Sequence, residues 1–484
     1  MVMSKELHER VKDVVLKELE VATPGTQSVD LSEMGISGLR RTQGYVRQEF
    51  LPQLIWPRAA KIYQEMTYND PIVGSILYTC EQLIKRISWK VEPRGNSRVD
   101  QEAKEFLESC IHDMSYAWSD VIDEILTMMS YGFAWHEEVY KTREGYNRDP
   151  RRNSKYADGR IGWRKIAGRA QQSIEEWVFD DDGGILAAIQ RAESDLKTRV
   201  LPLEKSVLFR TKFRYDNPEG YSLLRNAYRP WYFKKHIEEI EGIGIERDLA
   251  GLPVLQTPEG VDIWNPADKN AGKLKANAET LVCNIRRDEN EGVVLPHGWD
   301  LSLLSTGGRR QIDTNAIISR YDQRIAVTLM ADIIMMGSEG IGSFALAGVK
   351  RGMLGAALDA LTHSVADVLN QHSVPRLFRL NAFPGITGYP KIVPGEVVTP
   401  NLNELARLIQ ALAGAKMPLF PDENLEEYLR EIVGMPSLEA LTPQQRREQL
   451  EQMEEREDRG GGPNLAIRTD DQRQQNVGLP SDAR

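Results

Sequence analysis

Two long helical patterns on either side of a short strand-and-turn segment constrain this chain more than any other feature. The first runs from about residue 223 to 250, where Gly251 is placed to end a helix and Pro253 to stop it, and we expect Pro230 to kink or restart it. At 1.5 Å per residue, this helix and a second one from about 309 to 336 should each be roughly 37 to 42 Å long, a matched pair that favours antiparallel packing. The apolar residues of the second helix recur at helical spacing, at Ile312, Ile317, Ile318, Tyr321, Ile325, Leu329 and Ile333.

The regions around and between these helices predict a mixed fold. Helical spacing covers residues 70–87, 100–114 and 118–132, and Ser119 is a plausible cap for the last of these helices. The pattern is therefore that of an α+β protein that is mainly helical. Alternating or short apolar runs predict strands at 88–93, 134–141, 162–169, 174–180, 185–190 and 207–213, and between the long helices at 280–288, 291–296 and 299–305.

A glycine-rich stretch, Gly337 to Ser343, follows the second long helix. Its glycines have the spacing of the phosphate-binding loop G-x-x-x-x-G-K-[ST], but Ser343 stands where the lysine is required and Phe344 where the hydroxyl residue is required. The dinucleotide-binding pattern also fails, because Ala345 replaces its third glycine. The apolar residues in and around the stretch favour a flexible loop that contacts another molecule, and an ordinary helix–helix connection is the alternative.

The chain after this loop is again helical. We expect a third long helix over 353–381, bent or broken at Pro375, and shorter helices at 402–415 and 424–434. Residues 1 to about 55 mix a charged helix with loops and indicate a partly ordered arm. From about residue 443 the chain is rich in Gln, Glu and Arg and lacks apolar clusters, which indicates a largely disordered tail.

Side chains that could carry chemistry are few. The run Asp180 to Asp182 before two glycines could bind a metal, but Asp-Gly between two strands more simply predicts a hairpin turn. His363, His372 and the other histidines form no metal-binding pair, so we expect them to be solvated or structural. No serine or cysteine nucleophile motif occurs. These residues therefore give little support to an enzyme, and we expect no metal and no cofactor.

Cysteine usage, hydropathy and charge indicate a reducing, aqueous setting. Cys80, Cys110 and Cys283 are far apart, match no zinc or redox spacing, and are expected to be buried thiols. No apolar run is long enough to span a membrane, and the charged N-terminus lacks the apolar centre of a signal peptide, so we expect a cytoplasmic protein. The net charge of −10 argues against tight nucleic-acid binding. It does not exclude a surface along which DNA passes without sticking.

The order of these parts resembles that of the portal proteins of tailed bacteriophages, most closely the Mu-like portal family. A helix-and-strand unit is followed by "NPEGYSLLRNAYRPW", which opens the first long helix, and then by a small α/β insertion and the second long helix. A Gly-rich loop with "GSFAL" and a third long helix come next, and "KMPLFPDENLEEYLREIVGMP" closes the pattern. The resemblance covers about residues 60 to 435.

The resemblance implies a portal fold in which each segment has a named part. These parts are an N-terminal arm (1–59), an α+β wing (60–222), a first stem helix (223–251), a clip (252–304), a second stem helix (305–336), a tunnel loop (337–350), a long helix with its return to the wing (351–400), a crown-like helical region (401–440) and a charged, largely disordered tail (441–484).

The resemblance also implies a function, which is structural and involves no enzyme activity. The chain would form a homo-oligomeric, dodecameric ring at one capsid vertex, through which double-stranded DNA is packaged and ejected. Its partners would be the DNA, the terminase large subunit, the major capsid protein and head–tail connector or adaptor proteins, with no membrane. It would reside in the virion, and in the host cytoplasm during assembly. Such a ring would carry a charge of about −120 and repel phosphate on average, so DNA should slide with little friction.

The tunnel loop would narrow this channel and touch DNA without regard to sequence. Its candidate residues are Gly337, Ser338, Glu339, Gly340, Ile341, Gly342, Ser343, Phe344 and Lys350. Among the charged stem residues, Arg309 and Arg310 are the first candidates to face DNA. The alternative for all of them is a solvated face or an intersubunit ion pair, and the full set is Lys234, Lys235, Glu238, Glu239, Glu241, Arg309, Arg310, Asp313, Arg320 and Arg324.

Two other functions remain open at this point. One is a metal-dependent DNA-processing enzyme that uses Asp180 to Asp182. The other is a capsid scaffold or adaptor that forms no channel. Electron microscopy of the purified protein separates them, since only the portal predicts rings with a central hole.

Overall fold

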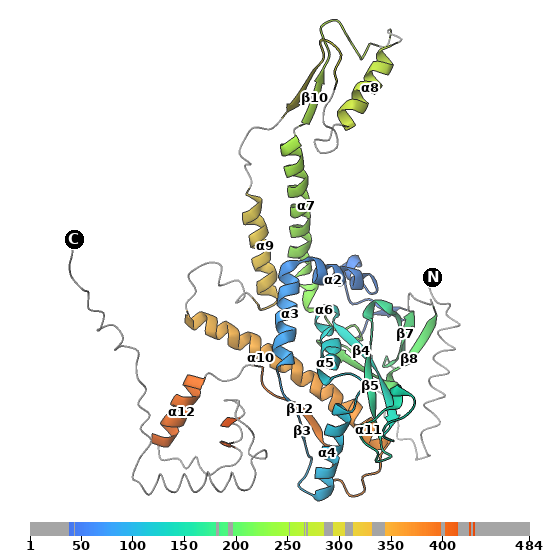
Figure 1. Ribbon diagram of the computed structural model, residues 1–484, viewed down its shortest axis with the longest axis vertical. Helices are drawn as coiled ribbons and strands as arrows, with labels where there is room; N and C mark the ends of the chain where they lie inside the picture. Colours follow the sequence, from blue (N-terminus) through green and yellow to red (C-terminus); the bar gives the residue numbers. More distant parts are fainter. Residues whose placement is uncertain are drawn as a thin grey trace, which may run out of the picture. The chain divides into compact units, whose positions relative to one another are not determined.

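The computed structural model describes residues 38–397 apart from 43, 181–182, 192–196, 251, 266, 268–269, 285–293, 305–312 and 332–343, and further on 402–414, 425–426 and 429–430. The chain divides into two units, 1–397 and 398–484. The first unit mixes helices and strands, as the α+β prediction requires (Figure 1). In the second, α12 (Leu402–Gly414) confirms the helix expected at 402–415. The helix expected at 424–434 lies largely outside the described residues.

Two consecutive helices open the ordered part of the first unit. α2 (Arg58–Asn69) is followed directly by α3 (Pro71–Lys85), and Asp70 separates them. The Asp70 carboxylate accepts the backbone N–H groups of Ile72 and Val73, each at 3.0 Å, while proline occupies the first helical position, where its missing N–H has no partner to lose. α3 was expected from its apolar spacing; α2 was not.

Three further helices precede the main sheet: α4 (Arg98–His112), α5 (Trp118–Leu126) and α6 (Met128–Tyr131). The prediction that Ser119 caps α5 is wrong, because the helix already includes Trp118. The cap residue is Ala117, whose backbone N–H donates to the Asp120 carboxylate at 3.2 Å. Gly132 ends α6 in the left-handed region, at φ 97°.

The strands form antiparallel sheets of two or three members. β4 is the central strand of the largest core sheet and runs directly on from α6. The sheets are β5 (Ile161–Arg169) with β4 (Phe133–Thr142) and β9 (Ser206–Arg210); β6 (Ile174–Phe179) with β7 (Ile185–Arg191) and β8 (Thr198–Pro202); β3 (Trp89–Glu92) with β12 (Lys391–Pro394); and β1 (Arg41–Thr42) with β2 (Tyr45–Val46).

Aromatic side chains join these sheets into one core. Phe133 of β4 packs against Trp177 of β6, with 5.2 Å between ring centroids. Trp56 packs on Phe133 at 5.0 Å, and its indole N–H donates to the carbonyl of Ile174 at 2.8 Å. The segment before α2 is therefore fastened to both sheets. The largest fully buried aromatic residues are Trp135, Trp163, Trp177, Phe133 and Phe209.

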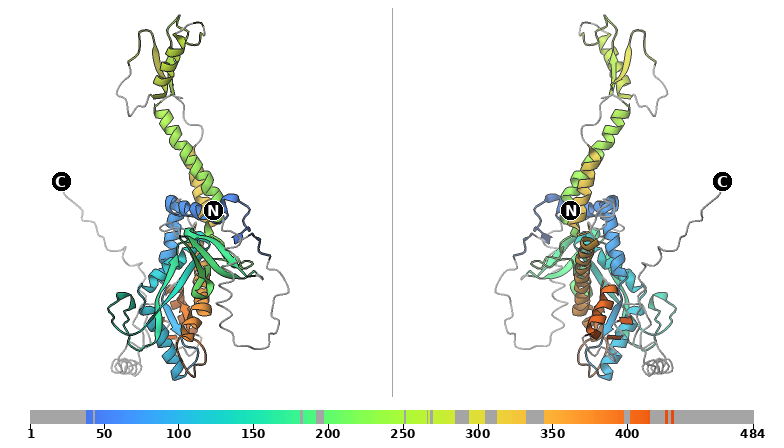
Figure 2. Two further views of the ribbon diagram at one scale, coloured as in Figure 1. Left: turned by 90° about the vertical axis from the view of Figure 1, so that its right-hand side faces the viewer. Right: turned by 90° about the vertical axis from the view of Figure 1, so that its left-hand side faces the viewer.

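The two long helices are present, and the chain between them forms a small module (Figure 2). α7 (Tyr228–Ala250) leads to β10 (Leu252–Gln256), α8 (Ala271–Asn284) and β11 (Asp300–Leu304), and α9 (Thr314–Thr328) then runs back along α7. β10 and β11 pair antiparallel. The expected antiparallel arrangement of the long helices is confirmed.

Two sequence predictions about this segment are wrong. The strand expected at 280–288 is helical as far as residue 284, because the preceding run of Ala, Leu, Lys and Glu is strongly helix-forming and carries α8 through it. Cys283 consequently lies on an exposed position of this helix, whereas Cys80 and Cys110 are buried as expected.

The long helices also differ in length. α7 has 23 residues and α9 has 15, which corresponds to about 35 Å and about 22 Å. Asp313, in an extended conformation, caps the start of α9 by accepting the N–H of Ala316 at 3.0 Å, and a turn at Leu329 and Met330 ends it. The expectation of a matched pair, with a helix over 309–336, is therefore wrong.

The third long helix is confirmed but starts earlier than expected. α10 (Phe344–Val368) continues through a π-helical turn (Leu369–Ser373) into α11 (Val374–Arg379). Pro375 has no N–H to donate and its ring crowds the carbonyl one turn earlier, so the wider turn lets the chain stay helical.

The end of this helical run is fastened to the main sheet. The Arg376 guanidinium binds the Glu138 carboxylate at 2.9 Å and donates to the carbonyls of Ser206 and Leu203 at 2.7 and 3.0 Å. The chain then returns through β12 to pair with β3. None of the helices in the described part of the chain combines the length and the apolarity that crossing a bilayer demands.

Candidate channel-forming helices

The turn before α7 explains the "NPEGYS" motif. Asn217 accepts the N–H of Glu219 at 2.9 Å through its side chain, and Gly220 adopts φ 57°. A Cβ atom at Gly220 would lie 2.1 Å from the carbonyl oxygen of Gly132, so only glycine fits. The Ser222 hydroxyl accepts the N–H of Leu224 at 3.0 Å and donates to the carbonyl of Ser130 at 2.5 Å. The start of α7 is thereby fixed to the end of α6.

Pro230 lies in the first turn of α7 rather than in its interior. An N–H group has no intrahelical partner there, so proline is tolerated, and α7 runs from Tyr228 to Ala250 as one helix without restarting. Trp231, in the next position, is buried against the core.

A buried lysine joins α7 to two other helices. The Lys234 ammonium lies 3.0 Å from the Asp70 carboxylate, at the cap of α3, and 2.6 Å from the Asp322 carboxylate of α9. Glu238, one turn further along α7, is 3.8 Å away. Since Asp70 also caps α3, Lys234 links the first turn of α3 to α7 through Asp70 and to α9 through Asp322.

The balance of forces keeps this lysine charged. Burial alone would lower the pKa of Lys234, but hydrogen bonds to Asp322 and Asp70 outweigh burial, so its pKa is raised. For the Glu238 carboxyl, burial acts in the other direction and raises the pKa. The buried Lys234 ammonium is stable only with its carboxylate partners present, because their attraction offsets the free energy lost when the ammonium leaves water.

Other contacts along the helix pair follow the same antiparallel register. Phe233 of α7 stacks on Tyr321 of α9 at a centroid distance of 6.4 Å, and the Thr314 hydroxyl donates to Glu241. Lys235 pairs with Glu65 of α2. Lys234, Lys235 and Glu241 are thus bound within the chain, rather than on the solvated face or in the intersubunit pair that the sequence suggested.

The end of α9 is a tight helix stop. Met330 takes the left-handed conformation, at φ 55°, with its N–H donating to the carbonyl of Val327 at 3.1 Å. The next N–H, of Ala331, donates to the carbonyl of Ala326 at 2.9 Å. This is the pattern in which glycine usually stands, and a methionine in it is strained.

The predicted site residues fall mainly beyond this stop. Residues 337–343 lie outside the described part of the chain, as do Arg309 and Arg310, which precede the cap at Asp313. Phe344 and Lys350 belong to α10, so the expectation of a loop as far as residue 350 is wrong. The sequence from Phe344 onwards is rich in Ala, Leu, Lys and Arg, which favours a helix.

A basic groove, which sequence reasoning did not identify as a unit, opens between α7 and α9. It has a volume of about 540 Å³ and contains Arg229, Arg320 and Arg324. Each guanidinium lies 5.4 to 6.0 Å from the ring of Phe233 or Tyr321. Among the described residues, none of the three has a carboxylate partner. The i, i+4 spacing of Arg320 and Arg324, which puts both on one face of a helix, is the sequence feature that could have indicated this groove.

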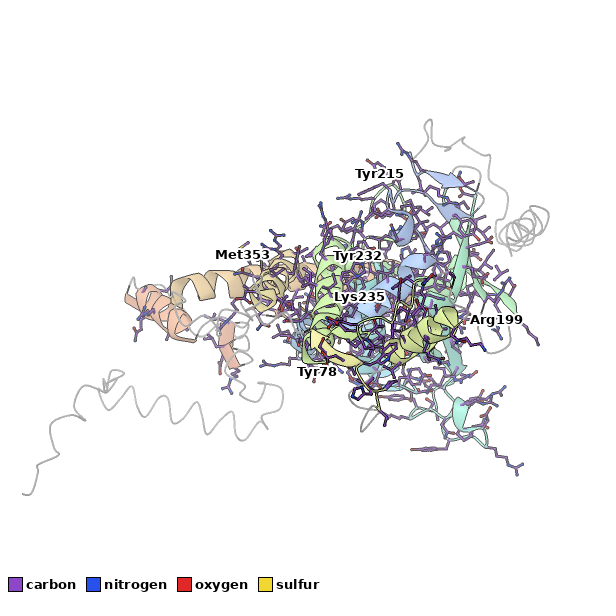
Figure 3. The ribbon with its side chains drawn as sticks, turned by 90° about the horizontal axis from the view of Figure 1, so that it is seen from above. Tyr78, Arg199, Tyr215, Tyr232, Lys235 and Met353 are labelled. Carbon is purple, nitrogen blue, oxygen red and sulfur yellow. The ribbon has the colours of Figure 1, made fainter. Side chains whose placement is uncertain are left out.

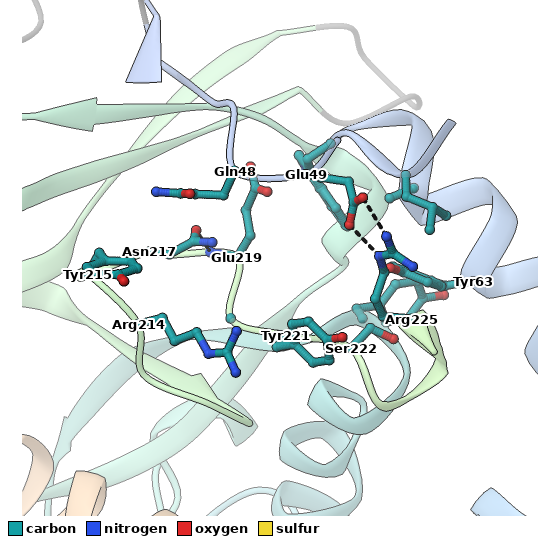
Figure 4. Close-up of a pocket in the computed structure, with 15 residues that line it drawn as sticks. Gln48, Glu49, Tyr63, Arg214, Tyr215, Asn217, Glu219, Tyr221, Ser222 and Arg225 are labelled. Carbon is teal, nitrogen blue, oxygen red and sulfur yellow. Dashed lines mark hydrogen bonds and ion pairs between the residues drawn. The ribbon is translucent and has the colours of Figure 1, made fainter. Parts of the chain in front are cut away.

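A smaller pocket of about 180 Å³ lies beside the start of α7 (Figure 4). Arg225 forms a two-pronged ion pair with Glu49 across it, one of whose bonds is 2.7 Å long. Tyr215 in its wall and the next residue, Asp216, both have positive φ, at 51° and 53°. Burial raises the pKa of the Glu219 carboxyl to about 8. The pocket holds no nucleophile–base pair among its described residues, and its ion pair fastens the N-terminal segment to the base of α7.

The acidic run expected to form a turn lies between paired strands. β6 and β7 pair antiparallel on either side of it, and Asp180 accepts the N–H groups of Gly183 and Gly184 at 2.6 and 2.5 Å. Asp181 and Asp182 lie outside the described residues. Within the part of the chain that the structure describes, no three His, Cys, Asp or Glu side chains are grouped to hold a metal.

The histidines that the structure describes share no site either. His363 and His372 are exposed on the third helical run, as expected for solvated residues. His136 is the opposite case: both ring nitrogens are buried without a hydrogen bond, and burial lowers its pKa to about 3. It is a core residue of β4.

Comparison with solved structures gives weak likenesses. A chain in the virion of a native gene transfer agent particle has a TM-score of 0.45 and 11% identity, with 79% of this chain and 95% of that chain covered. Chains in the necks of native and empty particles of this kind, computed with C12 and C6 symmetry, also have TM-scores of 0.45, at 10% identity, with 79% of this chain and 94 and 95% of those chains covered. Likenesses this weak support no conclusion about function.

Comparison with protein families is decisive. The model of the family described as "Portal protein of Mu bacteriophage" matches residues 60–435, which is most of the chain. The match spans the sheet core, the long helices with their module, the segment of the glycine-rich stretch and the third helical run. The chain belongs to the family of Mu bacteriophage portal proteins.

Proposed function

We propose that this protein forms a ring around a channel at one vertex of a capsid, through which double-stranded DNA is packaged and later ejected. The observation that carries the proposal is the helix pair: α9 returns antiparallel along α7 after a small module, inside the segment that matches the portal family (Figure 2). Helices in such pairs can stand side by side around an axis, with their exposed faces against neighbouring copies.

Each segment then has a part in the ring. Residues 60–222 form the wing against the major capsid protein, α7 and α9 the stem, and residues 252–304 the clip that docks the terminase large subunit. Connector or adaptor proteins take that place after packaging. Residues 351–400 return to the wing, 401–440 form a crown-like region, and 1–59 and 441–484 are the arm and the tail. The ring assembles in the host cytoplasm and remains in the virion.

The net negative charge of the chain suits a channel through which DNA moves rather than a site that binds DNA tightly. Each copy has a net charge of −10, so the ring as a whole repels phosphate and DNA slides with few lasting contacts. The narrowest part is assigned to residues 337–343 with the start of α10 at Phe344 and Lys350. Arg309 and Arg310, just before α9, remain candidates for brief phosphate contacts.

The constriction is tested by Phe344→Asp. The change places a charge where an apolar ring would meet DNA, and we expect it to leave assembly intact and to reduce packaged DNA at least tenfold. Packaging is measured as nuclease-protected DNA in particles reconstituted with terminase. Phe213→Asp, at an exposed residue outside this segment, is the matched control. Normal packaging by Phe344→Asp would remove this segment from the mechanism.

Electron microscopy of the purified protein separates this function from the alternatives. A portal gives rings with a central hole. A DNA-processing enzyme gives monomers that cut DNA when Mg²⁺ is added, and Asp181→Ala would abolish the cutting. A portal carrying Asp181→Ala should assemble and package normally, since the sequence predicts a turn residue there.

A further inference from the structure

The lysines and arginines of the helix pair whose side chains are described fall into two groups. Lys234 and Lys235, on the side of α7 that meets α9 and α2, are bound to carboxylates of their own chain. Arg229, Arg320 and Arg324 line the groove on another side and have no such partner among the described residues. Guanidinium groups held over aromatic rings are well placed to bind carboxylates from outside.

Charge is also divided along α7. Residues 228–237 include Arg229, Lys234 and Lys235 and no carboxylate. Residues 238–250 have the opposite character, with one arginine, Arg247, against five acidic residues: Glu238, Glu239, Glu241, Glu246 and Asp248. Since α9 runs antiparallel, Arg320 and Arg324 add to the basic half. The helix pair therefore has a basic half next to the core and an acidic half beyond it.

Apolar residues surround these charges at positions that a lone chain would leave in water. Phe233 and Val327 line the groove and are 43% and 54% exposed. On the acidic half of α7, Ile240 and Ile243 are 67% and 50% exposed. Tyr232, near Lys235 on the helix seen from above in Figure 3, is also exposed. Arginine, aromatic and aliphatic side chains together are typical of a protein–protein interface. A DNA backbone is contacted through polar and basic side chains, so exposed isoleucines do not favour it.

We propose that the groove of Arg229, Arg320 and Arg324 receives the acidic half of α7 from the next copy of this chain. The inference rests on the proposed ring and names one of its subunit contacts. A ring closes through two different patches that complement each other, and these two halves are the complementary patches of the helix pair. Arg229 and Glu238 are nine residues apart on α7, or about 14 Å, so neighbouring pairs must lie tilted for the halves to meet.

Charge reversal in the full-length protein tests the contact. Arg320→Glu with Arg324→Glu places acid against acid, and Glu239→Arg with Glu246→Arg places base against base. We expect each double variant to raise the protein concentration for half-maximal ring assembly about tenfold or more, and the four changes together to restore it. Assembly is measured by single-molecule mass determination at low and high salt. Arg148→Glu with Arg152→Glu, exposed on a distant loop, is the control of equal charge.

Cross-linking provides a readout that does not depend on assembly strength. With Cys283→Ser as background, Arg324→Cys together with Glu239→Cys should give a ladder of disulfide-linked copies on oxidation, and either cysteine alone should not. Rings that form normally with reversed arginines, and no ladder, would overturn the inference while leaving the ring intact. Normal rings that only bind DNA less tightly would assign the groove to DNA instead. Wild-type protein that forms no ring would remove the proposed function itself.

Discussion

The sheet core and the long-helix pair differ in how far their apolar side chains are buried and their charged side chains are paired. In the core, the large aromatic residues are fully buried against one another, and Arg376 and Lys141 are paired with buried carboxylates. Along α7 and α9, isoleucines face water and three arginines have no carboxylate partner among the described residues. The core is complete within one chain, whereas we propose that other copies cover the outer surface of the helix pair.

Lys234 marks the boundary between these regions, and its replacement should have the largest effect. Lys234→Met leaves Asp70 and Asp322 buried without their cation, so we expect the free energy of unfolding to fall by about 3–5 kcal/mol. Urea denaturation followed by circular dichroism measures it. Lys235→Met, on a more exposed pair, should cost no more than about 1 kcal/mol. Equal losses in the two variants would mean that the buried network does not hold the helices.

His136 tests the core through pH. Its pKa is about 3 in the folded protein and 6.5 when unfolded, so below pH 6.5 the unfolded chain binds a proton that the folded chain does not. The free energy of unfolding should fall by up to about 1.4 kcal/mol per pH unit between pH 6 and 4 from this group, and His136→Leu should flatten that slope. Denaturation at stepped pH measures it. An unchanged slope in His136→Leu would contradict the account, and His363→Gln is the exposed control.

Met330 tests the strained end of α9, with a smaller effect of opposite sign. Glycine adopts the left-handed conformation without the steric penalty, so Met330→Gly should stabilise the chain by about 1 kcal/mol. Thermal unfolding measures it. Met330→Ala keeps the penalty and should give no gain; a gain of the same size from alanine would show that backbone strain is not the cause.

Ile243 should give the smallest effect on the single chain. Because its side chain is half exposed, Ile243→Ser should change the free energy of unfolding of dissociated protein by no more than about 0.5 kcal/mol. It should nevertheless weaken ring assembly, measured as the concentration for half-maximal assembly. Ile325→Ser, buried on α9, should do the reverse and unfold the chain first. An assembly unaffected by Ile243→Ser would mean that this face meets no neighbour.

The sequence predicted the elements whose pattern is local. Apolar spacing located α3 and the second long helix, and Gly251 with Pro253 marked the end of the first. The glycines at 183 and 184 located the β6–β7 hairpin, and the order of the parts carried the resemblance to the family. α2 was missed although its buried residues, Ala59, Ala60, Tyr63 and Met66, recur at helical spacing. The end of α9 was missed because Met330 gives no sign of a helix stop.

The pairing of charges was the least predictable feature. Lys234 and Arg320 look alike in sequence, yet one is buried between Asp70 and Asp322 and the other lies in a groove without a carboxylate partner among the described residues. The difference depends on Asp70, more than a hundred positions away from Lys234, and on Asp322, which only the fold brings close. The candidate loop at 337–343 stays a prediction, as do the roles of Arg309 and Arg310.

Electron cryo-microscopy of the assembled protein tests the central claim most directly. The account predicts a closed ring in which α7 and α9 of each copy stand beside those of the next, with Ile240 and Ile243 covered by a neighbouring chain. Single chains in solution and in the capsid, with α7 and α9 packed inside one folded chain, would contradict it.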